Sequence, residues 1–149
     1  MEPAKISYSV KASWENDFND TQEAYAGTCS ETSPLEIDLR IWNNKYGITP
    51  VEDLKKFNLN LYFEKYEDAA LLPFIKIVYN EEEEMGLDIG DRYVVATFLD
   101  DVSISGAVNN GTELDIDNYI NLKITFEIPE GISLKNRDLK SLFLEIDEL

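Results

Sequence analysis

Apolar and polar residues alternate with a period of two along much of this chain. The clearest case is the stretch 57–63, whose odd-numbered positions are Phe, Leu, Leu and Phe. Because successive side chains of a strand point to opposite faces, such a stretch predicts a strand with one buried face. Two stretches, 73–79 and 92–99, are apolar on both faces, which is typical of central or doubly covered strands. About eight strands are expected, at residues 6–10, 35–41, 57–63, 73–79, 92–99, 102–104, 120–128 and 142–146.

The alternation also assigns faces within these strands. In the stretch 35–41, apolar residues at odd positions alternate with Glu36, Asp38 and Arg40, and Trp42 continues the outward set. The buried face should meet the inward faces of the other strands in one core. The residues expected at the centre of that core are Leu61, Phe63, Phe98, Ile124 and Phe126.

Helix signals are scarce. Residues 50–56 predict one helical turn, with Thr49 as N-cap and Pro50 in the first helical position. A short helix over 134–142 is an alternative, and a further turn is expected around 21–25. The surrounding segment, about 13–34, is polar and weakly patterned, and it predicts a long loop.

Regularly spaced short strands with few helices are typical of an all-β protein. We expect a β-sandwich or jelly-roll-like fold of about eight strands, with one or two short helical turns. A closed barrel is the second possibility. The length of 149 residues is that of one domain, so a single domain over 1–149 is expected.

Charge is the unusual property of the composition. The chain has 30 acids, 13 bases and no His, which gives a net charge of −17. Such a chain should be repelled by nucleic-acid phosphates and by anionic membranes, and attracted to basic surfaces. The predicted partner is therefore a protein with a basic surface, with no direct contact to nucleic acid or membrane.

The residue types present exclude several chemistries. Without His, the commonest general base and metal ligand is missing. Cys29 is the only cysteine, so zinc sites of Cys and His and an internal disulfide are excluded. No phosphate-binding glycine motif occurs. We therefore expect a protein that is not an enzyme and that has no cofactor and no metal.

Calcium is the one metal left open. Glu113, Asp115 and Asp117 alternate, and in a strand they would share a face. Hard cations bind clustered carboxylate oxygens. The spacing of an EF-hand is absent, and a solvated acidic face is the commoner interpretation of such a pattern.

Acidic residues are concentrated around the stretch 92–99. The run 81–84 consists of four adjacent glutamates, which cannot be buried together and predict an exposed hairpin tip. This tip is either a solubilising segment or part of a binding surface. The predicted partner-binding residues are Glu81, Glu82, Glu83, Glu84, Asp88, Asp91, Asp100 and Asp101.

These patterns favour a non-catalytic protein-binding module that acts through an acidic surface, such as an accessory protein of a phage or mobile element. The first alternative is a DNA-mimic inhibitor of a nucleic-acid-binding or defence complex, since rows of carboxylates resemble phosphates. The second is a structural or decoration subunit of a particle. The N-terminus lacks a basic region followed by an apolar run, so a cytoplasmic location is expected.

Overall fold

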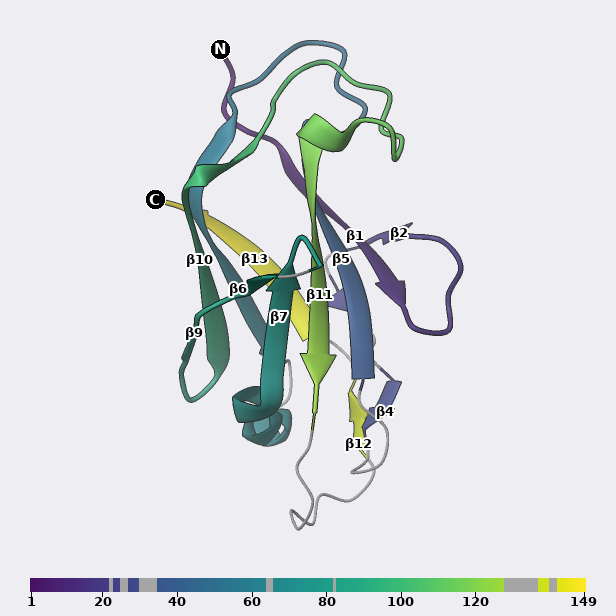
Figure 1. Ribbon diagram of the computed structural model, residues 1–149, viewed down its shortest axis with the longest axis vertical. Coiled ribbons are helices and arrows are strands. Elements are labelled where there is room, and N and C mark those ends of the chain that lie inside the picture. Colours follow the sequence, from purple (N-terminus) through teal and green to yellow (C-terminus); the bar gives the residue numbers. More distant parts are fainter. Residues whose placement is uncertain are drawn as a thin grey trace.

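The computed structural model of this chain describes residues 1–149, except for 22, 25–26, 30–34, 64–65, 82, 128–136 and 140–141. Its strands form two antiparallel sheets that pack face to face, and a small third sheet (Figure 1). The expectation of a β-sandwich is therefore confirmed, and the barrel is not observed. Helix is limited, in the described part, to two 3-10 segments, η1 (Tyr66–Phe74) and η2 (Ile116–Asn118).

The larger layer is a six-stranded sheet. Its order is β2 (Asn19–Asp20), β1 (Ile6–Ala12), β5 (Leu35–Asn43), β11 (Tyr119–Phe126), β7 (Ile75–Tyr79) and β8 (Glu83–Glu84). The second layer is a five-stranded sheet. Its order is β3 (Glu23–Ala24), β13 (Leu142–Glu148), β6 (Leu54–Phe63), β10 (Tyr93–Ile104) and β9 (Leu87–Ile89). The small sheet pairs β12 (Arg137–Leu139) with β4 (Gly27–Cys29).

The core lies between the two large sheets and contains the residues that the alternation predicts. Leu61, Phe63, Phe98, Ile124 and Phe126 are all at most 3% exposed. Phe63 of the five-stranded sheet meets Phe126 of the six-stranded sheet with ring centroids 5.7 Å apart. Burial of such rings supplies much of the hydrophobic stabilisation of a sandwich this size.

The predicted strands are present with several adjustments. The run expected over 120–128 ends at Phe126, and residue 128 lies outside the described residues. The runs 92–99 and 102–104 belong to one strand, β10, whose register against β6 shifts between Phe98 and Ser103. The run expected from residue 73 begins at Ile75, because Pro73 and Phe74 close the 3-10 segment η1. The predicted loop over 13–34 contains the short strands β2, β3 and β4 among its described residues.

The predicted helical turns are in the wrong places. Residues 50–53 are not helical, and β6 begins at Leu54. The reason is that distant groups take the hydrogen bonds of this segment: Val51 donates its N–H to the Gly106 carbonyl at 2.9 Å, and the Asn43 amide donates to the Glu52 carbonyl at 2.9 Å. A side chain at Gly106 would collide with the Val51 oxygen, so only glycine permits this approach.

The other two expected helices are also replaced by strands. Glu23–Ala24 forms β3 within the expected turn at 21–25. Of the stretch 134–142, residues 137–139 form β12 and Leu142 begins β13, whereas the rest lies outside the described residues. In the described part of the chain, no helix is both long and apolar enough to cross a membrane.

Candidate functional site

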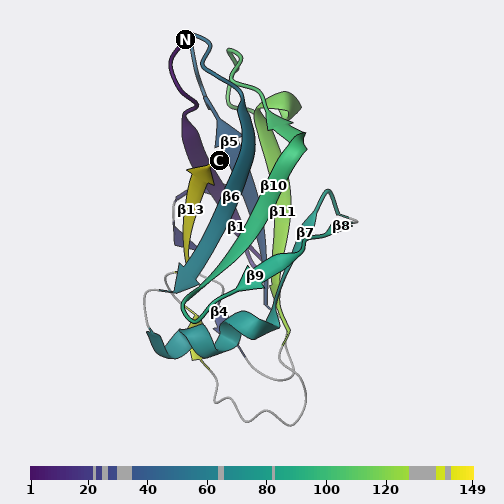
Figure 2. The same ribbon diagram turned by 90° about the vertical axis from the view of Figure 1, so that its left-hand side faces the viewer.

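Three of the predicted acidic residues lie where the two sheets adjoin at one side of the sandwich. Glu83 and Glu84 form β8, the outer strand of the six-stranded sheet, and Asp88 lies in β9, the outer strand of the five-stranded sheet. Only two residues separate β8 from β9, so the chain passes directly from one sheet to the other (Figure 2). The two outer strands therefore present their acids on the same side of the molecule.

The local backbone exposes these acids. Asn80 and Glu81 both have positive φ values, 53° and 65°, which turn the chain sharply after β7. Asn tolerates this conformation better than most residues, which favours the turn at this position. Six of the eight predicted residues have described side chains, and all six are exposed; they are Glu81, Glu83, Glu84, Asp88, Asp91 and Asp101. We call these six residues the acidic edge.

The acidic edge is extended rather than clustered. Asp91 precedes β10, while Asp101 lies ten residues later within it, which corresponds to ~33 Å of extended chain. Glu82 and the side chain of Asp100 lie outside the described residues. Among the ion pairs between described residues, none includes a carboxylate of the acidic edge.

On the outer face of the six-stranded sheet, several acids form ion pairs with lysines. Four of the acids on or beside this face have a lysine partner. The lysine Nζ to carboxylate oxygen distances are 3.8 Å for Lys11–Asp38, 2.6 Å for Lys45–Asp20, 3.2 Å for Lys76–Glu127 and 4.0 Å for Lys123–Glu36. Three of the four pairs join neighbouring strands or the segments that follow them. These four pairs neutralise part of the acidic charge of this face.

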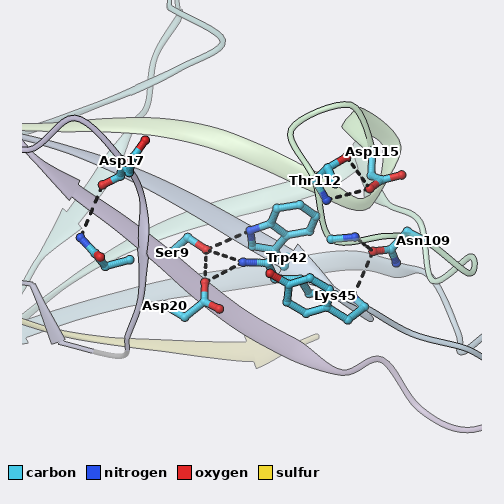
Figure 3. A network of polar contacts seen from close by, with 11 residues as sticks. Ser9, Asp17, Asp20, Trp42, Lys45, Asn109, Thr112 and Asp115 are labelled. Atoms are coloured by element: carbon cyan, nitrogen blue, oxygen red, sulfur yellow. Dashed lines mark hydrogen bonds and ion pairs between the residues drawn. The ribbon is translucent and has the colours of Figure 1, made fainter.

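A polar network anchors the segment 13–20 onto that face (Figure 3). The Trp42 indole N–H donates to the Ser9 hydroxyl at 3.1 Å, and this hydroxyl donates to an Asp20 carboxylate oxygen at 2.7 Å. The Lys45 ammonium binds the same Asp20 oxygen at 2.6 Å and lies 4.8 Å from the centre of the Trp42 ring. The hydrogen bond from Lys45, together with that from Ser9, holds the pKa of Asp20 below its usual value, although partial burial opposes the shift.

Two further contacts cover this face. Trp42 is only 2% exposed, which corrects the expectation of an outward, solvated position. It does point outward, but the Tyr119 ring packs on it at 4.7 Å between centroids. The Arg40 guanidinium lies between Phe18 and Tyr119, 4.1 Å and 4.3 Å from the two ring centres. The six-stranded sheet thus has a small second core outside the main one.

The outer face of the five-stranded sheet carries a row of aromatic rings. The register places Tyr93 opposite Tyr62, and Tyr62 opposite Phe143, so three neighbouring strands each contribute one ring. The Tyr62 and Phe143 rings stack with centroids 5.5 Å apart. Tyr93 stays 53% exposed. We call Tyr93, Tyr62 and Phe143 the aromatic row.

Acids and amides occupy the positions beside this row. Glu145 and Asp147 alternate with the buried residues of β13 and are exposed, and Asp147 accepts a hydrogen bond of 2.8 Å from the Asn60 amide. A shallow hollow opens between them and the rings, lined in part by Asn60, Tyr62, Tyr93, Arg92, Glu145 and Asp147. Tyr93 also lines a second hollow, together with Asp88 and Asp91 of the acidic edge. Arg92 lines both hollows and has a contact of its own.

Sequence reasoning missed the aromatic row and the acids beside it. Tyr62 had been placed on the polar face of its strand, and Phe143 and Tyr93 gave no separate signal. The three rings become neighbours through the register between β6, β10 and β13. The alternation within one strand does not reveal this register.

The residues considered for calcium are arranged differently from the expectation. Glu113, Asp115 and Asp117 lie in a turn and in η2 rather than along one strand face. The Asp115 carboxylate accepts hydrogen bonds from the Thr112 N–H and hydroxyl, at 2.9 and 3.1 Å (Figure 3). Over the part of the chain that is described, no three potential ligands gather into a group able to hold a metal ion.

One buried tyrosine lies close to the acids of β13. Burial raises the pKa of Tyr8 to about 12, a backbone hydrogen bond with Ile146 acts in the opposite direction, and the charges of Glu145 and Asp147 add to the rise. Tyr8 belongs to β1 of the six-stranded sheet, so the charges of two acids on the opposite sheet influence the pKa of a phenol in the core.

A scan against models of known protein families found none that matches this chain, and a search of curated proteins likewise found no match.

Proposed function

We propose that this protein is a cytoplasmic, non-catalytic protein-binding module that contacts a basic surface of a partner through its acidic edge. The observation that carries the proposal is the contrast in charge pairing. Asp20, Glu36, Asp38 and Glu127 on or beside the six-stranded face are each paired with a lysine, whereas no ion pair between described residues includes a carboxylate of the acidic edge.

The physical drive for binding comes from this imbalance. Like charges near one another on a chain with net charge −17 repel, which disfavours the isolated fold. A basic surface would relieve the repulsion, and the summed field of the edge would accelerate its approach. An exposed edge is also accessible without any rearrangement of the sandwich.

The test is to replace the four glutamates Glu81, Glu82, Glu83 and Glu84 with glutamine. The partner is first isolated from the native host at low salt, and its association rate with the parent and variant is then measured over a range of salt concentrations. We expect a slower association for the variant, with the difference shrinking as salt rises. The variant should fold normally, because the described residues of the segment are exposed.

A matched control removes the same charge elsewhere. Replacing Glu2, Glu52, Glu113 and Glu148 with glutamine alters four exposed acids outside the acidic edge. If this control slows association as much as the 81–84 variant, total charge rather than the edge controls binding. If neither variant slows it, the run 81–84 is only a solubilising tip and the proposal is wrong.

The two alternative functions remain predictions with distinct outcomes. A DNA mimic would compete with duplex DNA for the same basic partner, and its binding would depend steeply on salt. A particle subunit would form a regular oligomer whose size grows with protein concentration. A protein-binding module of any other kind would show neither competition with duplex DNA nor growth of a regular oligomer with protein concentration.

A further inference from the structure

We infer that the aromatic row, with the acids beside it, is the centre of the contact surface and that it binds arginine side chains of the basic partner. This inference rests on the proposed function and makes it more specific. The acidic edge would then form the rim that attracts the partner, while the outer face of the five-stranded sheet would make the close contacts.

Exposed ring surface is the first observation. Tyr93 is 53% exposed and lines two hollows. The neighbouring Tyr62 and Phe143 are fixed by their mutual stacking and by the strands that carry them. Rigid aromatic side chains lose little conformational entropy on binding, which is one reason that tyrosine is frequent at the centres of protein interfaces.

Charge complementarity is the second observation, and it selects the partner chemistry. Glu145 and Asp147 line one hollow with Tyr93, and Asp88 and Asp91 line the other, so four carboxylates face the one arginine, Arg92, that lines both. A cation that lies on the Tyr93 ring would therefore have carboxylates within the same hollows. Rings attract cations through their electron-rich faces, and the adjacent carboxylates add charge-assisted hydrogen bonds.

Arginine fits this arrangement better than lysine. Its guanidinium is planar, so one face can stack on a tyrosine ring while the edge donates two parallel hydrogen bonds to a carboxylate. The six-stranded sheet already contains this kind of contact, because Arg40 lies between the Phe18 and Tyr119 rings and donates from Nε to Asn121 at 2.9 Å. On the six-stranded face the cation comes from the chain itself. On the five-stranded face Arg92 of the chain lines the hollows together with four carboxylates, and the partner would supply a further cation.

The test uses a fluorescent peptide of alternating arginine and glycine, and a lysine–glycine peptide of the same length and charge. Affinities are measured by fluorescence anisotropy at physiological salt for the parent, Tyr93→Leu and Tyr93→Phe. We expect Tyr93→Leu to weaken binding of the arginine peptide by about tenfold, as for a central interface residue. Tyr93→Phe keeps the ring and should bind nearly as the parent does.

The matched control is Tyr46→Leu. Tyr46 is 60% exposed, close to the value for Tyr93, but it follows β5 at the opposite end of the sandwich. We expect no change for this variant, and we expect the parent to bind the arginine peptide several-fold more tightly than the lysine peptide. Equal unfolding midpoints in urea would show that all variants are folded.

The outcomes separate this inference from the proposed function. If Tyr93→Leu binds the arginine peptide as the parent does, but replacement of the glutamates 81–84 weakens binding, the row is not the centre and the acidic edge alone makes the contact. If neither change weakens binding, both proposals fail. Tyr93-dependent binding of a neutral oligosaccharide, with no binding of the arginine peptide, would also overturn the inference, because the face would then recognise sugars.

Discussion

Each outer face of the sandwich carries a large aromatic residue at an outward position, but Trp42 is 2% exposed and Tyr93 is 53% exposed. On the six-stranded face, the segment 13–20 and the Tyr119 ring cover the neighbourhood of Trp42, and nearby acids are paired with lysines. On the five-stranded face, the ring stays open and the acids beside it are absent from the described ion pairs.

The difference shows that strand alternation alone does not decide what an outward residue does. Both faces arise from the same period of two, yet on one face the outward ring is covered by other residues of the chain, and on the other face the outward ring is exposed. Rings and charges that pack within the chain stabilise the fold, whereas the exposed ring and carboxylates of the five-stranded face would contribute mainly to the binding that we propose.

The largest expected effect is the loss in free energy of unfolding when the Trp42 ring is removed, compared with removal of the Tyr93 ring. Trp42→Ala should destabilise the fold by ~3–5 kcal/mol, because it deletes a buried ring and leaves the Ser9–Asp20–Lys45 network without its indole donor. Tyr93→Ala should cost less than about 1 kcal/mol, as is usual for exposed positions. Urea unfolding of both variants gives the comparison, and equal losses would show that the five-stranded face is also a structural surface.

The second prediction is a loss of folding stability at alkaline pH. The folded-state pKa of Tyr8 is about 12, above the ordinary value of 10.0 for the unfolded chain. Between these two values the unfolded state loses the proton first, so the stability that the neutral phenol contributes declines as pH rises from about 10 to about 12. Tyr8→Phe should lose less stability than the parent over this window, as measured by urea unfolding at several pH values.

The same tyrosine reports on the charge of the five-stranded face. Replacing Glu145 with Gln and Asp147 with Asn removes two charges that raise the Tyr8 pKa, so that pKa should fall. Ultraviolet titration of the phenol, against Tyr8→Phe as the blank, measures the shift. An unchanged pKa would mean that these carboxylates are fully screened by solvent.

A smaller effect is expected for the Lys45–Asp20 ion pair, in which the aspartate is exposed and the lysine is largely covered. A double-mutant cycle of Lys45→Met and Asp20→Asn should give a coupling energy of at most ~1 kcal/mol, which decreases with salt. The lowered pKa of Asp20 means that its contribution is present above the ordinary aspartate pKa and is lost as pH falls through the lower folded-state value. A coupling that survives in strong salt would contradict a solvent-screened pair.

The smallest effect should have the opposite sign. Replacing Glu81, Glu83 and Glu84 with glutamine should raise stability by a few tenths of a kcal/mol at low salt, because it relieves repulsion without breaking a described ion pair. At high salt the gain should vanish. Urea midpoints at two salt concentrations are sufficient, and a loss of stability would mean that these acids have stabilising partners.

Most of the fold was predictable because local residue types and the period of two agree with the tertiary structure. Leu61, Ile124 and Phe126 are buried where alternation places them. The helical turn at 50–56 was predicted wrongly because its backbone is bound by Gly106 and Asn43, and no local pattern reveals these distant partners.

The candidate surface was predictable only in part. The exposure of Glu83 and Asp88 follows from their charge, but their common side of the sandwich depends on the order of strands in two sheets. The aromatic row depends on register across three strands, and the burial of Trp42 depends on a loop that folds back over β5. Such features are set by long-range pairing rather than by composition.

The position of β13 has a consequence for the order of folding. This last strand of the chain pairs with β6 along seven residues, between β6 and β3, so the five-stranded sheet stays incomplete until residues 142–148 have been synthesised. Until then, one backbone edge of β6 lacks its partner, and unpaired strand edges promote aggregation of nascent chains. Repulsion between chains with a net charge of −17 would oppose aggregation during this interval.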